Sequence, residues 1–444
     1  MPARVPPGPK GHFLTGNVRE FRRDRLGLFL RCARDYGDVA AVRIGPIRGL
    51  VLSHPDAIEY VLVTNNHNFI KHFALRRNRL FLGNGLLTSE GDFWLRQRRL
   101  IQPAFNRRHL DGYGAVMIDC ARHLLAEWRD GETRELSAEM TRLTLEIAAR
   151  ALFGAEAGTD AREVGEAMAV AHASFENRIA GIYPLPRWLP TPGNYRLQQA
   201  ARRVDAIIYR FIAERRRNGG ERDDVLSLLL RARDEDDGSR MTDKQLRDEA
   251  MTLFLAGHET TALALTWTGY LLAQHPEIAE RLRADLAAVL GDRPPAVADL
   301  PRLACAERVV LEAMRLYPPV YAFGREALHD CEIMGYAVPR GTTVFMSQWA
   351  MHRDPRWFHE PEKFDPDRWA DGLAGRLPKF AYFPFGGGPR VCIGNAFALM
   401  EAVLVLATLA PRYRFELVPG QHIVPWPVMT LRPKPGVRVV LRRV

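Results

Sequence analysis

The chain has no long apolar run. Nowhere in its 444 residues do about eighteen consecutive apolar residues occur, the length that a membrane-spanning helix needs. The first ten residues, MPARVPPGPK, lack the apolar segment of a signal peptide. The longest apolar stretch, residues 402–410, is closed by Pro411 and is predicted to be a buried helix. We therefore expect a soluble, cytoplasmic protein without a membrane anchor.

Cysteine is scarce as well. The chain has five cysteines, an odd number, and none of them forms a C-x-x-C pair. This pattern argues against a disulfide framework and against a zinc site, and it favours a reducing compartment. The cysteines are Cys32, Cys120, Cys305, Cys331 and Cys392.

Lysine is also rare, because only six of the 62 basic residues are lysine and the rest are arginine. The formal net charge is +10, which would attract nucleic acid, an anionic membrane or an acidic protein. No nucleic-acid motif accompanies the charge. An acidic protein partner is the favoured interpretation.

The composition is that of an ordinary globular protein, with 47% hydrophobic residues, no repeat and no long low-complexity segment. We predict a single domain over residues 1–444, with a β-rich N-terminal lobe and a larger helical lobe. Alternating apolar residues predict strands at residues 39–44 and 49–53, joined by a Gly-Pro turn.

One short segment combines features that suit metal binding. Residues 385–394 read FGGGPRVCIG, which contains the pattern Phe-x-x-Gly-x-Arg-x-Cys-x-Gly, expected by chance in roughly one of ten thousand such chains. Cys392 lies between glycine-rich backbone and an apolar helical run, where amide N–H groups and a helix N-terminus favour the thiolate, the form that binds iron. The alternative is an inert cysteine buried in a tight turn.

A long helix is predicted from a capping box at Thr242 and Gln245 to His275, which Pro276 follows. At 1.5 Å per residue it would be roughly 50 Å long. Its middle, residues 256–261, reads AGHETT. Glycine costs about 1 kcal/mol relative to alanine in a helix and threonine competes for backbone carbonyls, so we expect a locally opened helix there.

In each of two further pairs, the two residues stand about one helical turn apart. Trp94 and Arg98 share a face of a helix predicted over residues 92–102, and their donors suit a carboxylate or a propionate. The alternative is a core tryptophan beside a solvated arginine. Glu312 and Arg315 likewise share a face of a helix at residues 303–316, where an exposed pair would contribute only a few tenths of a kcal/mol.

Together, in the order from Trp94 to Cys392, these motifs resemble those of the cytochrome P-450 superfamily, the haem-thiolate monooxygenases, over essentially the whole chain. The resemblance implies a mainly α fold with small β-sheets (α+β), a triangular prism whose long central helix crosses the haem. The implied cofactor is haem b, with Cys392 as the axial iron ligand. Phe385 would shield its sulfur.

The resemblance also implies roles for other residues. Glu259 and Thr260 would be catalytic, Thr260 binding dioxygen or a nearby water and Glu259 relaying protons, because O–O cleavage consumes two protons in a dry pocket. Glu312, Arg315 and Arg368 would form a buried structural network, although the family usually has Glu-Arg-Phe where this chain has Asp-Arg-Trp at residues 367–369. The implied cofactor-binding residues are Trp94, Arg98, Gly257, Arg325, Phe385, Arg390, Cys392 and Gly394.

The predicted function is insertion of one oxygen atom from O2 into a hydrophobic, lipid-like or terpenoid substrate. Residues 69–88, a lid at 179–194, Phe254, residues 320–323 and Met429-Thr430 are expected to face it. The chain shows no flavin or iron–sulfur domain, so a separate ferredoxin or flavodoxin with its reductase is the expected electron source. It would dock on Arg96, Arg99, Arg107 and Arg108, unless these form only a solvated basic face.

Two other functions fit parts of the pattern. A peroxide-driven peroxygenase would use the same fold, but such relatives usually lack an acid–alcohol pair like Glu259-Thr260. A non-enzymatic haem protein that senses gas or carries electrons would not need that pair. A monooxygenase turns over with a reductase system, whereas a peroxygenase turns over with peroxide, so this comparison separates the two.

Overall fold

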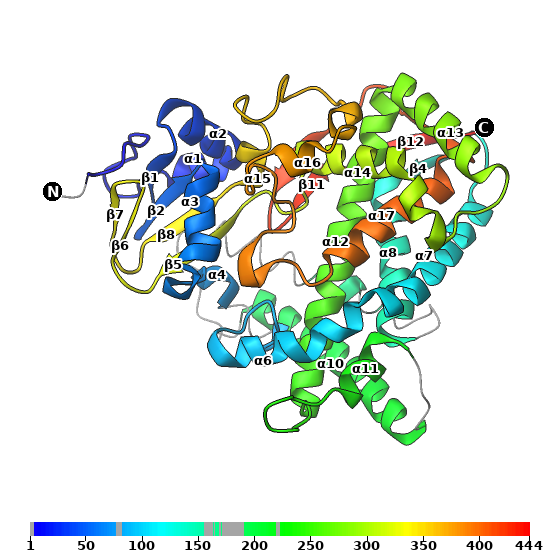
Figure 1. The fold of residues 1–444 in the computed structure, drawn as a ribbon, viewed down its shortest axis with the longest axis horizontal. Coiled ribbons are helices and arrows are strands. Elements are labelled where there is room, and N and C mark those ends of the chain that lie inside the picture. Colours follow the sequence, from blue (N-terminus) through cyan, green and yellow to red (C-terminus); the bar gives the residue numbers. More distant parts are fainter. Residues whose placement is uncertain are drawn as a thin grey trace. The chain divides into compact units, whose positions relative to one another are not determined.

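The structure is a computed structural model that describes residues 4–76, 82–154, 163, 165–167, 170, 191–218 and 223–444. Contacts divide the chain into two compact units. Unit 1 comprises Met1–Arg76 and Leu311–Cys392, and unit 2 comprises Arg77–Val310 and Ile393–Val444. Figure 1 shows the fold, with elements labelled where there is room. The organisation of residues 1–444 as one domain stays a prediction.

Unit 1 is built on a mixed sheet with the strand order β1-β2-β8-β5-β3. The antiparallel pair β1–β2 confirms the two strands predicted from the sequence. β2 pairs in parallel with β8, a strand from far along the chain, with Gly49 opposite Thr343. The strands are β1 (Val39–Ile44), β2 (Ile47–Leu52), β3 (Phe69–Lys71), β5 (Phe323–Ala327) and β8 (Thr343–Met346).

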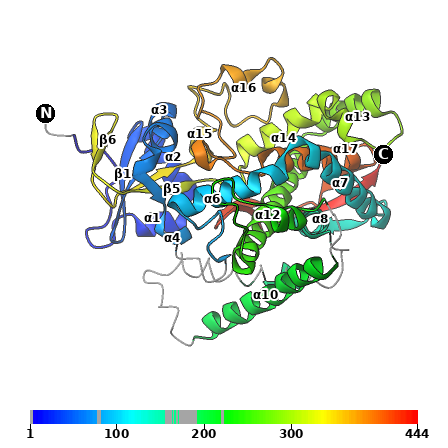
Figure 2. The ribbon, with the colours of Figure 1, turned by 60° about the horizontal axis from the view of Figure 1, so that its bottom comes forward.

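Short helices and a hairpin complete unit 1. The hairpin β6–β7 (Cys331–Ile333 and Tyr336–Val338) lies beside β1 in Figures 1 and 2. One apolar cluster, which includes Leu52, Ile58, Val344 and Phe383, joins the sheet to the segment that precedes the cysteine loop. The helices are α1 (Val18–Arg23), α2 (Arg25–Asp35), α3 (Pro55–Glu59), α4 (Phe73–Arg76), α15 (Gln348–Met351) and α16 (Leu373–Arg376). The short turns are η1 (Tyr60–Thr64), η2 (Asn66–Asn68), η5 (Pro366–Trp369) and η6 (Gly388–Arg390).

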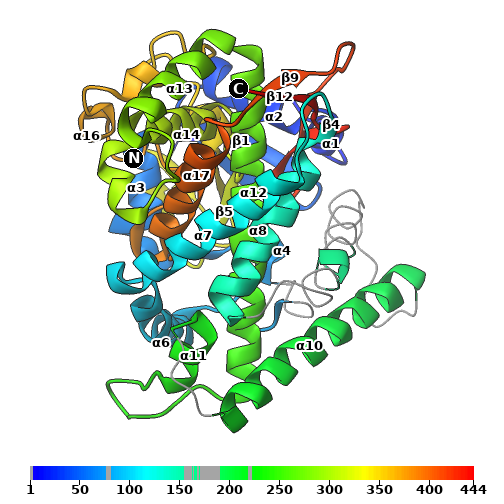
Figure 3. The ribbon, with the colours of Figure 1, turned by 90° about the vertical axis from the view of Figure 1, so that its right-hand side faces the viewer.

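Unit 2 is mainly helical. α12 packs against α8, α10 and α17, and Figure 3 shows α10 reaching the N-terminal end of α12, where Arg247 Nε donates to Asp205 Oδ1 at 2.6 Å. The helices are α6 (Gly91–Ile101), α7 (Arg107–Glu127), α8 (Leu136–Phe153), α10 (Pro192–Asn218), α11 (Val225–Arg231), α12 (Asp243–Gln274), α13 (Pro276–Leu290) and α17 (Asn395–Leu409). The turns η3 (Gln102–Phe105) and η4 (Val297–Arg302) also belong to unit 2, and α14 (Ala304–Leu316) continues from unit 2 into unit 1.

Two small sheets flank these helices. One has the order β4-β12-β9, and the other is the antiparallel hairpin β10–β11. The strands are β4 (Thr133–Glu135), β9 (Tyr413–Leu417), β10 (Val424–Pro427), β11 (Leu431–Lys434) and β12 (Arg438–Arg443). No helix in the part of the chain that the structure describes has both the length and the hydropathy of a membrane span.

The predicted capping box begins α12: Thr242 Oγ1 accepts from the Gln245 amide and the Gln245 side chain accepts from the Thr242 amide. The helix then runs unbroken for 32 residues, so the expected opening near Gly257 is wrong. The hydroxyls of Thr260 and Thr261 donate to carbonyls four residues earlier, while the helix continues through them. Packing of its buried neighbours outweighs the weak local propensity.

Candidate active site: the cysteine loop and the threonine helix

The loop that carries Cys392 is shaped by its glycines. Gly386 and Gly388 have φ values of 72° and 66°, in the left-handed region that side chains rarely adopt. The Cys392 amide donates to the Phe385 carbonyl at 3.0 Å and closes the loop. A Cβ on Gly388 would lie 1.8 Å from the Leu62 carbonyl oxygen of η1, so the backbone here approaches too closely for any other residue.

Cys392 differs from the other cysteines in its exposure. Burial raises the pKa of Cys32 and of Cys120 to about 12 and that of Cys305 to about 11. These thiols stay protonated and are poor ligands. Cys392 alone of the five, all within the described chain, is exposed. It is therefore the thiol open to an external ligand.

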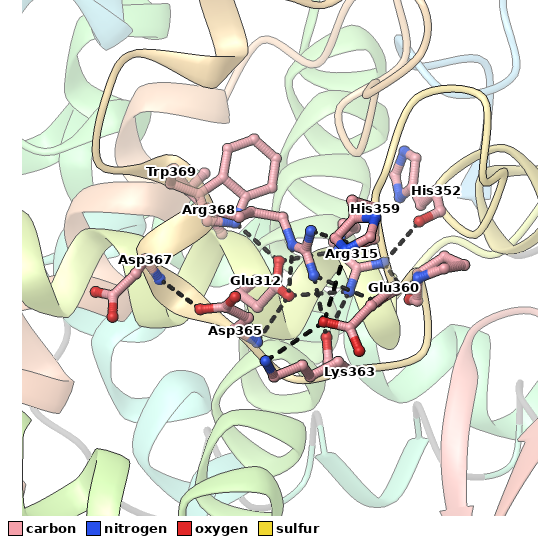
Figure 4. A network of polar contacts seen from close by, with 12 residues as sticks. Glu312, Arg315, His352, His359, Glu360, Lys363, Asp365, Asp367, Arg368 and Trp369 are labelled. Carbon is pink, nitrogen blue, oxygen red and sulfur yellow. Dashed lines mark hydrogen bonds and ion pairs between the residues drawn. The ribbon is translucent and has the colours of Figure 1, made fainter.

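A charged network braces the segment before the loop (Figure 4). Glu312 and Arg315 are fully buried and paired, with Arg315 Nε donating to Glu312 Oε2 at 2.9 Å. Arg368 Nε donates to Glu312 Oε1 at 3.0 Å, and the indole of Trp369 donates to Oε2 at 2.9 Å. The triad implied by the resemblance is present, and Trp369 takes part where the family usually has phenylalanine.

His352 joins this network to the cysteine loop, a role that the sequence reasoning missed. Its carbonyl accepts from Arg315 Nη1 at 2.8 Å, and its ring Nε2 accepts from the Phe383 amide at 3.0 Å. Complete burial lowers the pKa of His352 well below its usual value, so the neutral ring can accept this bond. Phe383 stands two residues before Phe385, so the triad positions the start of the loop.

In unit 2, the middle of α12 carries an open face on an otherwise buried helix. Ala256 is exposed and Gly257 and Thr260 are partly exposed, whereas the residues on both sides are buried. A Cβ on Gly257 would meet no atom within 4 Å. The Thr260 hydroxyl donates to the Ala256 carbonyl at 2.8 Å. His258 is buried, with its ring Nδ1 2.9 Å from the Phe254 carbonyl oxygen, and its own carbonyl accepts from Thr144 of α8 at 2.8 Å.

Glu259 points away from that open face. Its side chain is 8% exposed and pairs with Arg432 of β11. Oε1 accepts from Arg432 Nε at 3.0 Å and from the Thr430 hydroxyl at 2.9 Å. Sequence reasoning noted Thr430 only as substrate-facing and missed Arg432, because 173 positions separate it from Glu259.

The other predicted cofactor residues lie on several elements. In unit 2, Trp94 is buried on α6, Arg98 is half-buried one turn later, and Gly394 precedes the first turn of α17. In unit 1, Arg325 of β5 lies over the Phe323 ring at 5.1 Å, and Arg390 is half-buried in η6. Their roles stay predictions.

The residues fit an iron porphyrin. Unit 1 supplies an exposed thiol on a braced glycine loop, together with the half-buried guanidiniums of Arg325 and Arg390, which suit propionates. Unit 2 supplies a helix face where a glycine and a threonine are open. These donors match the chemistry of a thiolate-ligated haem, in which the thiolate increases electron density on the iron.

The predicted docking and substrate-facing residues lie in several places. Arg96 and Arg99 pair with Asp234 at 3.1 Å and with Asp236 at 2.6 Å, so the acidic loop neutralises part of the expected docking charge. Phe254 is buried against Phe153, with ring centroids 5.8 Å apart. Of the predicted lid, residues 179–190 lie outside the described residues, and Pro192 begins α10.

The cytochrome P450 family model matches residues 6–440. Cyclooctatin synthase of Streptomyces melanosporofaciens is 37% identical over 96% of this chain and 93% of its own length. Cyclooctat-9-en-7-ol 5-monooxygenase of the same organism is 37% identical over 88% of this chain and 85% of its own. Pentalenene oxygenase of Streptomyces avermitilis is 36% identical over 91% and 90%.

Among solved structures, retinoic acid-bound cyanobacterial CYP120A1 matches with a TM-score of 0.88 and 28% identity, covering all of both chains. The fold is therefore the mainly α P450 fold with small sheets that the sequence predicted. With the thiol loop, the buried triad and the open helix face in place, these matches show that the chain belongs to the cytochrome P450 family and is a monooxygenase with a haem-iron cofactor.

Proposed function

We propose that this protein is a single-domain haem-thiolate monooxygenase that inserts one oxygen atom from O2 into a terpenoid or related lipid-like substrate. The observation that carries the proposal is Cys392, the exposed cysteine, on a loop that glycine backbone and the Glu312 network fix in place. Terpenoid chemistry is supported by the names of three relatives, a cyclooctatin synthase, a cyclooctat-9-en-7-ol 5-monooxygenase and a pentalenene oxygenase.

In this proposal, the cofactor is haem b. Cys392 ligates the iron, Phe385 shields the sulfur, and Gly257 and Gly394 allow close approach of the backbone. Trp94, Arg98, Arg325 and Arg390 bind the propionates. When bound, the haem supplies O2 activation and oxidation of a substrate C–H bond.

The chain itself supplies protons and a dry environment. Thr260 lies on the open face of α12, where its hydroxyl can exchange its bond to the Ala256 carbonyl for one to oxygen or water. Glu259 is a buried carboxylate that can take up and release a proton. Water exclusion is favoured by the apolar burial around this segment of α12.

Electrons are proposed to arrive from a separate ferredoxin or flavodoxin with its reductase. The net charge of +10 favours an acidic partner. Arg107 and Arg108 are exposed at the start of α7 and remain candidates for docking, as does the partly neutralised pair Arg96 and Arg99. Reversing the charge at Arg107 and Arg108 should slow reduction and weaken its salt dependence.

The absorption spectrum of the reduced, carbon monoxide-bound protein tests the ligand. A thiolate-ligated haem gives a strongly red-shifted band, which we expect for the wild type and for the control Cys331→Ser but not for Cys392→Ser. If Cys392→Ser retains the band, the ligand assignment is wrong.

Substrate class is tested by spectral titration with terpene hydrocarbons, terpene alcohols and fatty acids. Terpenes are expected to shift the haem spectrum and to be hydroxylated with O2, reductase and ferredoxin. Product formation with hydrogen peroxide alone, and none with the reductase system, would favour the peroxygenase.

A further inference from the structure

The acidic loop, residues 234–239 between α11 and α12, reads DEDDGS and so begins with four consecutive acids. Its own backbone closes it. The Asp234 amide donates to the Ser239 carbonyl at 2.8 Å, and the Gly238 amide donates to the Asp234 carbonyl at 2.9 Å. The Asp236 amide also donates to Asp234 Oδ1 at 3.0 Å. These bonds hold the loop closed without any contribution from α6.

Two ion pairs join the acidic loop to α6, and they differ in burial. Arg96 Nε lies 3.1 Å from Asp234 Oδ2, with side chains that are 21% and 3% exposed, and Arg96 Nη2 donates to the Ser239 hydroxyl at 2.5 Å. Arg99 Nη2 donates to Asp236 Oδ2 at 2.6 Å, but these side chains are 43% and 70% exposed. Breaking the first pair would leave a buried carboxylate without its cation, which is costly, whereas both partners of the second pair are readily hydrated. The loop is thus anchored at Arg96 and releasable at Arg99.

The face of α6 that carries Arg99 also carries an exposed apolar side chain. Leu95 is 47% exposed and precedes Arg99 by four residues, so the two side chains are neighbours on the helix surface. Protein interfaces combine an apolar centre with a polar and charged rim. A partner that covers Leu95 would meet the Arg99 guanidinium beside it, which suits a carboxylate. Arg99 is already paired with a carboxylate of its own chain.

We propose that the acidic loop is an internal competitor for the partner that docks on α6, an inference that rests on the proposed monooxygenase function. Asp236 occupies Arg99 in the free protein, and a small acidic electron-transfer protein displaces Asp236 when it binds over Leu95 and Arg99. The anchor at Arg96 stays in place, so the loop returns to Arg99 when the partner leaves. The loop therefore weakens the complex and shortens its lifetime, which suits a carrier that has to leave after each delivery of electrons.

A double-mutant cycle on Asp236 and Arg99 tests the competition. The dissociation constant is measured by titration calorimetry at low salt with two probes, an oxidised acidic ferredoxin and an oxidised flavodoxin. Asp236→Asn should tighten binding about fivefold, the effect of one unit charge at contact distance in water. Arg99→Gln should weaken binding by at most about twofold in wild type, where Arg99 is paired, and about tenfold in Asp236→Asn, where Arg99 is open to the partner.

The cycle separates competition from a general charge effect. Effects of distant charges add, whereas competition for one guanidinium does not. The pattern in either probe supports the inference and identifies that carrier as the partner. The inference is overturned if the two substitutions change the dissociation constant additively with both probes, if Asp236→Asn binds both like wild type, or if neither probe binds wild type and Asp236→Asn.

Two controls match these changes elsewhere in unit 2. Glu416→Gln removes an acid from an exposed pair, with Arg442 at 2.8 Å, and should bind the probes like wild type. Leu95→Ala should weaken binding about fivefold in wild type and in Asp236→Asn, because less apolar surface is covered. Tyr209→Ala removes a side chain of similar exposure, 41%, from α10 and should leave binding unchanged. Equal binding by Leu95→Ala and wild type would refute the place of Leu95 in the docking surface.

The carbon monoxide spectrum separates this inference from the proposed function. If wild type lacks the thiolate-type band, the proposed function fails, and the cycle still decides whether Asp236 competes for Arg99. If every variant has the band and the effects in the cycle add, the proposed function stands and the competition is refuted.

Discussion

Glu312→Gln should be among the most destabilising single changes in unit 1. The Glu312 carboxylate is fully buried and accepts hydrogen bonds from both Arg315 and Arg368. It also accepts from the Asp365 amide at 3.0 Å and from the Trp369 indole at 2.9 Å. Glutamine has nearly the same shape, but it removes the negative charge that two arginines share and it leaves only one acceptor oxygen.

The expected loss follows from burial. Arg315 is fully buried and Arg368 is 9% exposed, so neither guanidinium can be solvated in place of the lost carboxylate. Removing one partner of a buried ion pair costs about 3–5 kcal/mol, a large share of the stability of an ordinary domain. With a urea dependence of about 1–3 kcal/mol per molar, the unfolding midpoint should fall by at least about 1 M.

Urea unfolding followed by tryptophan fluorescence measures this loss, with Glu360→Gln as the control. Glu360 pairs with Lys363 at 3.5 Å, and both side chains are 57% exposed. Such an exposed pair contributes at most about 1 kcal/mol, so the control midpoint should stay close to wild type. Equal midpoints for Glu312→Gln and Glu360→Gln would refute the idea that the buried triad holds the cysteine loop in place.

Further substitutions test other parts of the structure. Gly388→Ala should abolish the thiolate-type carbon monoxide band, because its Cβ would lie 1.8 Å from the Leu62 carbonyl oxygen. Gly386→Ala is the comparison, because its Cβ would have its nearest contact at 4.0 Å. It should lower the free energy of unfolding in urea by only about 1–2 kcal/mol, through backbone strain. Thr242→Ala should lower the unfolding free energy by about 1 kcal/mol through loss of the α12 cap, and an unchanged value would contradict the cap's contribution. Burial raises the pKa of Glu401 well above its usual value. The stability that the protonated Glu401 carboxyl contributes is fully present below its pKa in the unfolded chain, about 4.5, and is lost as the pH rises above that value. Glu401→Gln should therefore be more stable than wild type, by a margin that grows from about pH 5 to about pH 8.

Local sequence patterns predicted those parts of the site whose residues lie close together in the sequence. The capping box at Thr242 predicted the start of α12, and the pattern at residues 385–394 marked the glycine-rich loop that carries Cys392. The Glu312–Arg315 pair was visible as a one-turn spacing. Its burial could be inferred only from the resemblance, because a pair with this spacing is usually exposed.

The partners that the sequence did not reveal are distant along the chain. Arg432 meets Glu259 across 173 positions, and His352 meets Phe383 across 31. Nothing in the local periodicity of residues 424–434 marks Arg432, since it stands between Leu431 and Pro433 in a strand of only four residues. Helix propensity also misjudged Gly257, because the packing that keeps α12 continuous involves helices that no local pattern can identify.

The parallel pairing of β2 with β8 has a consequence for how the protein is made. Thr343 is synthesised 291 positions after Leu52, which at ribosomal rates of roughly 5–20 residues per second takes roughly 15–60 s. During that time β2 has β1 on one side and an unpaired edge on the other, the kind of edge that promotes aggregation. Cys392 leaves the ribosome later still. We therefore expect the N-terminal strands to need protection in the cell until β8 arrives, and haem to enter only after most of the chain has been released.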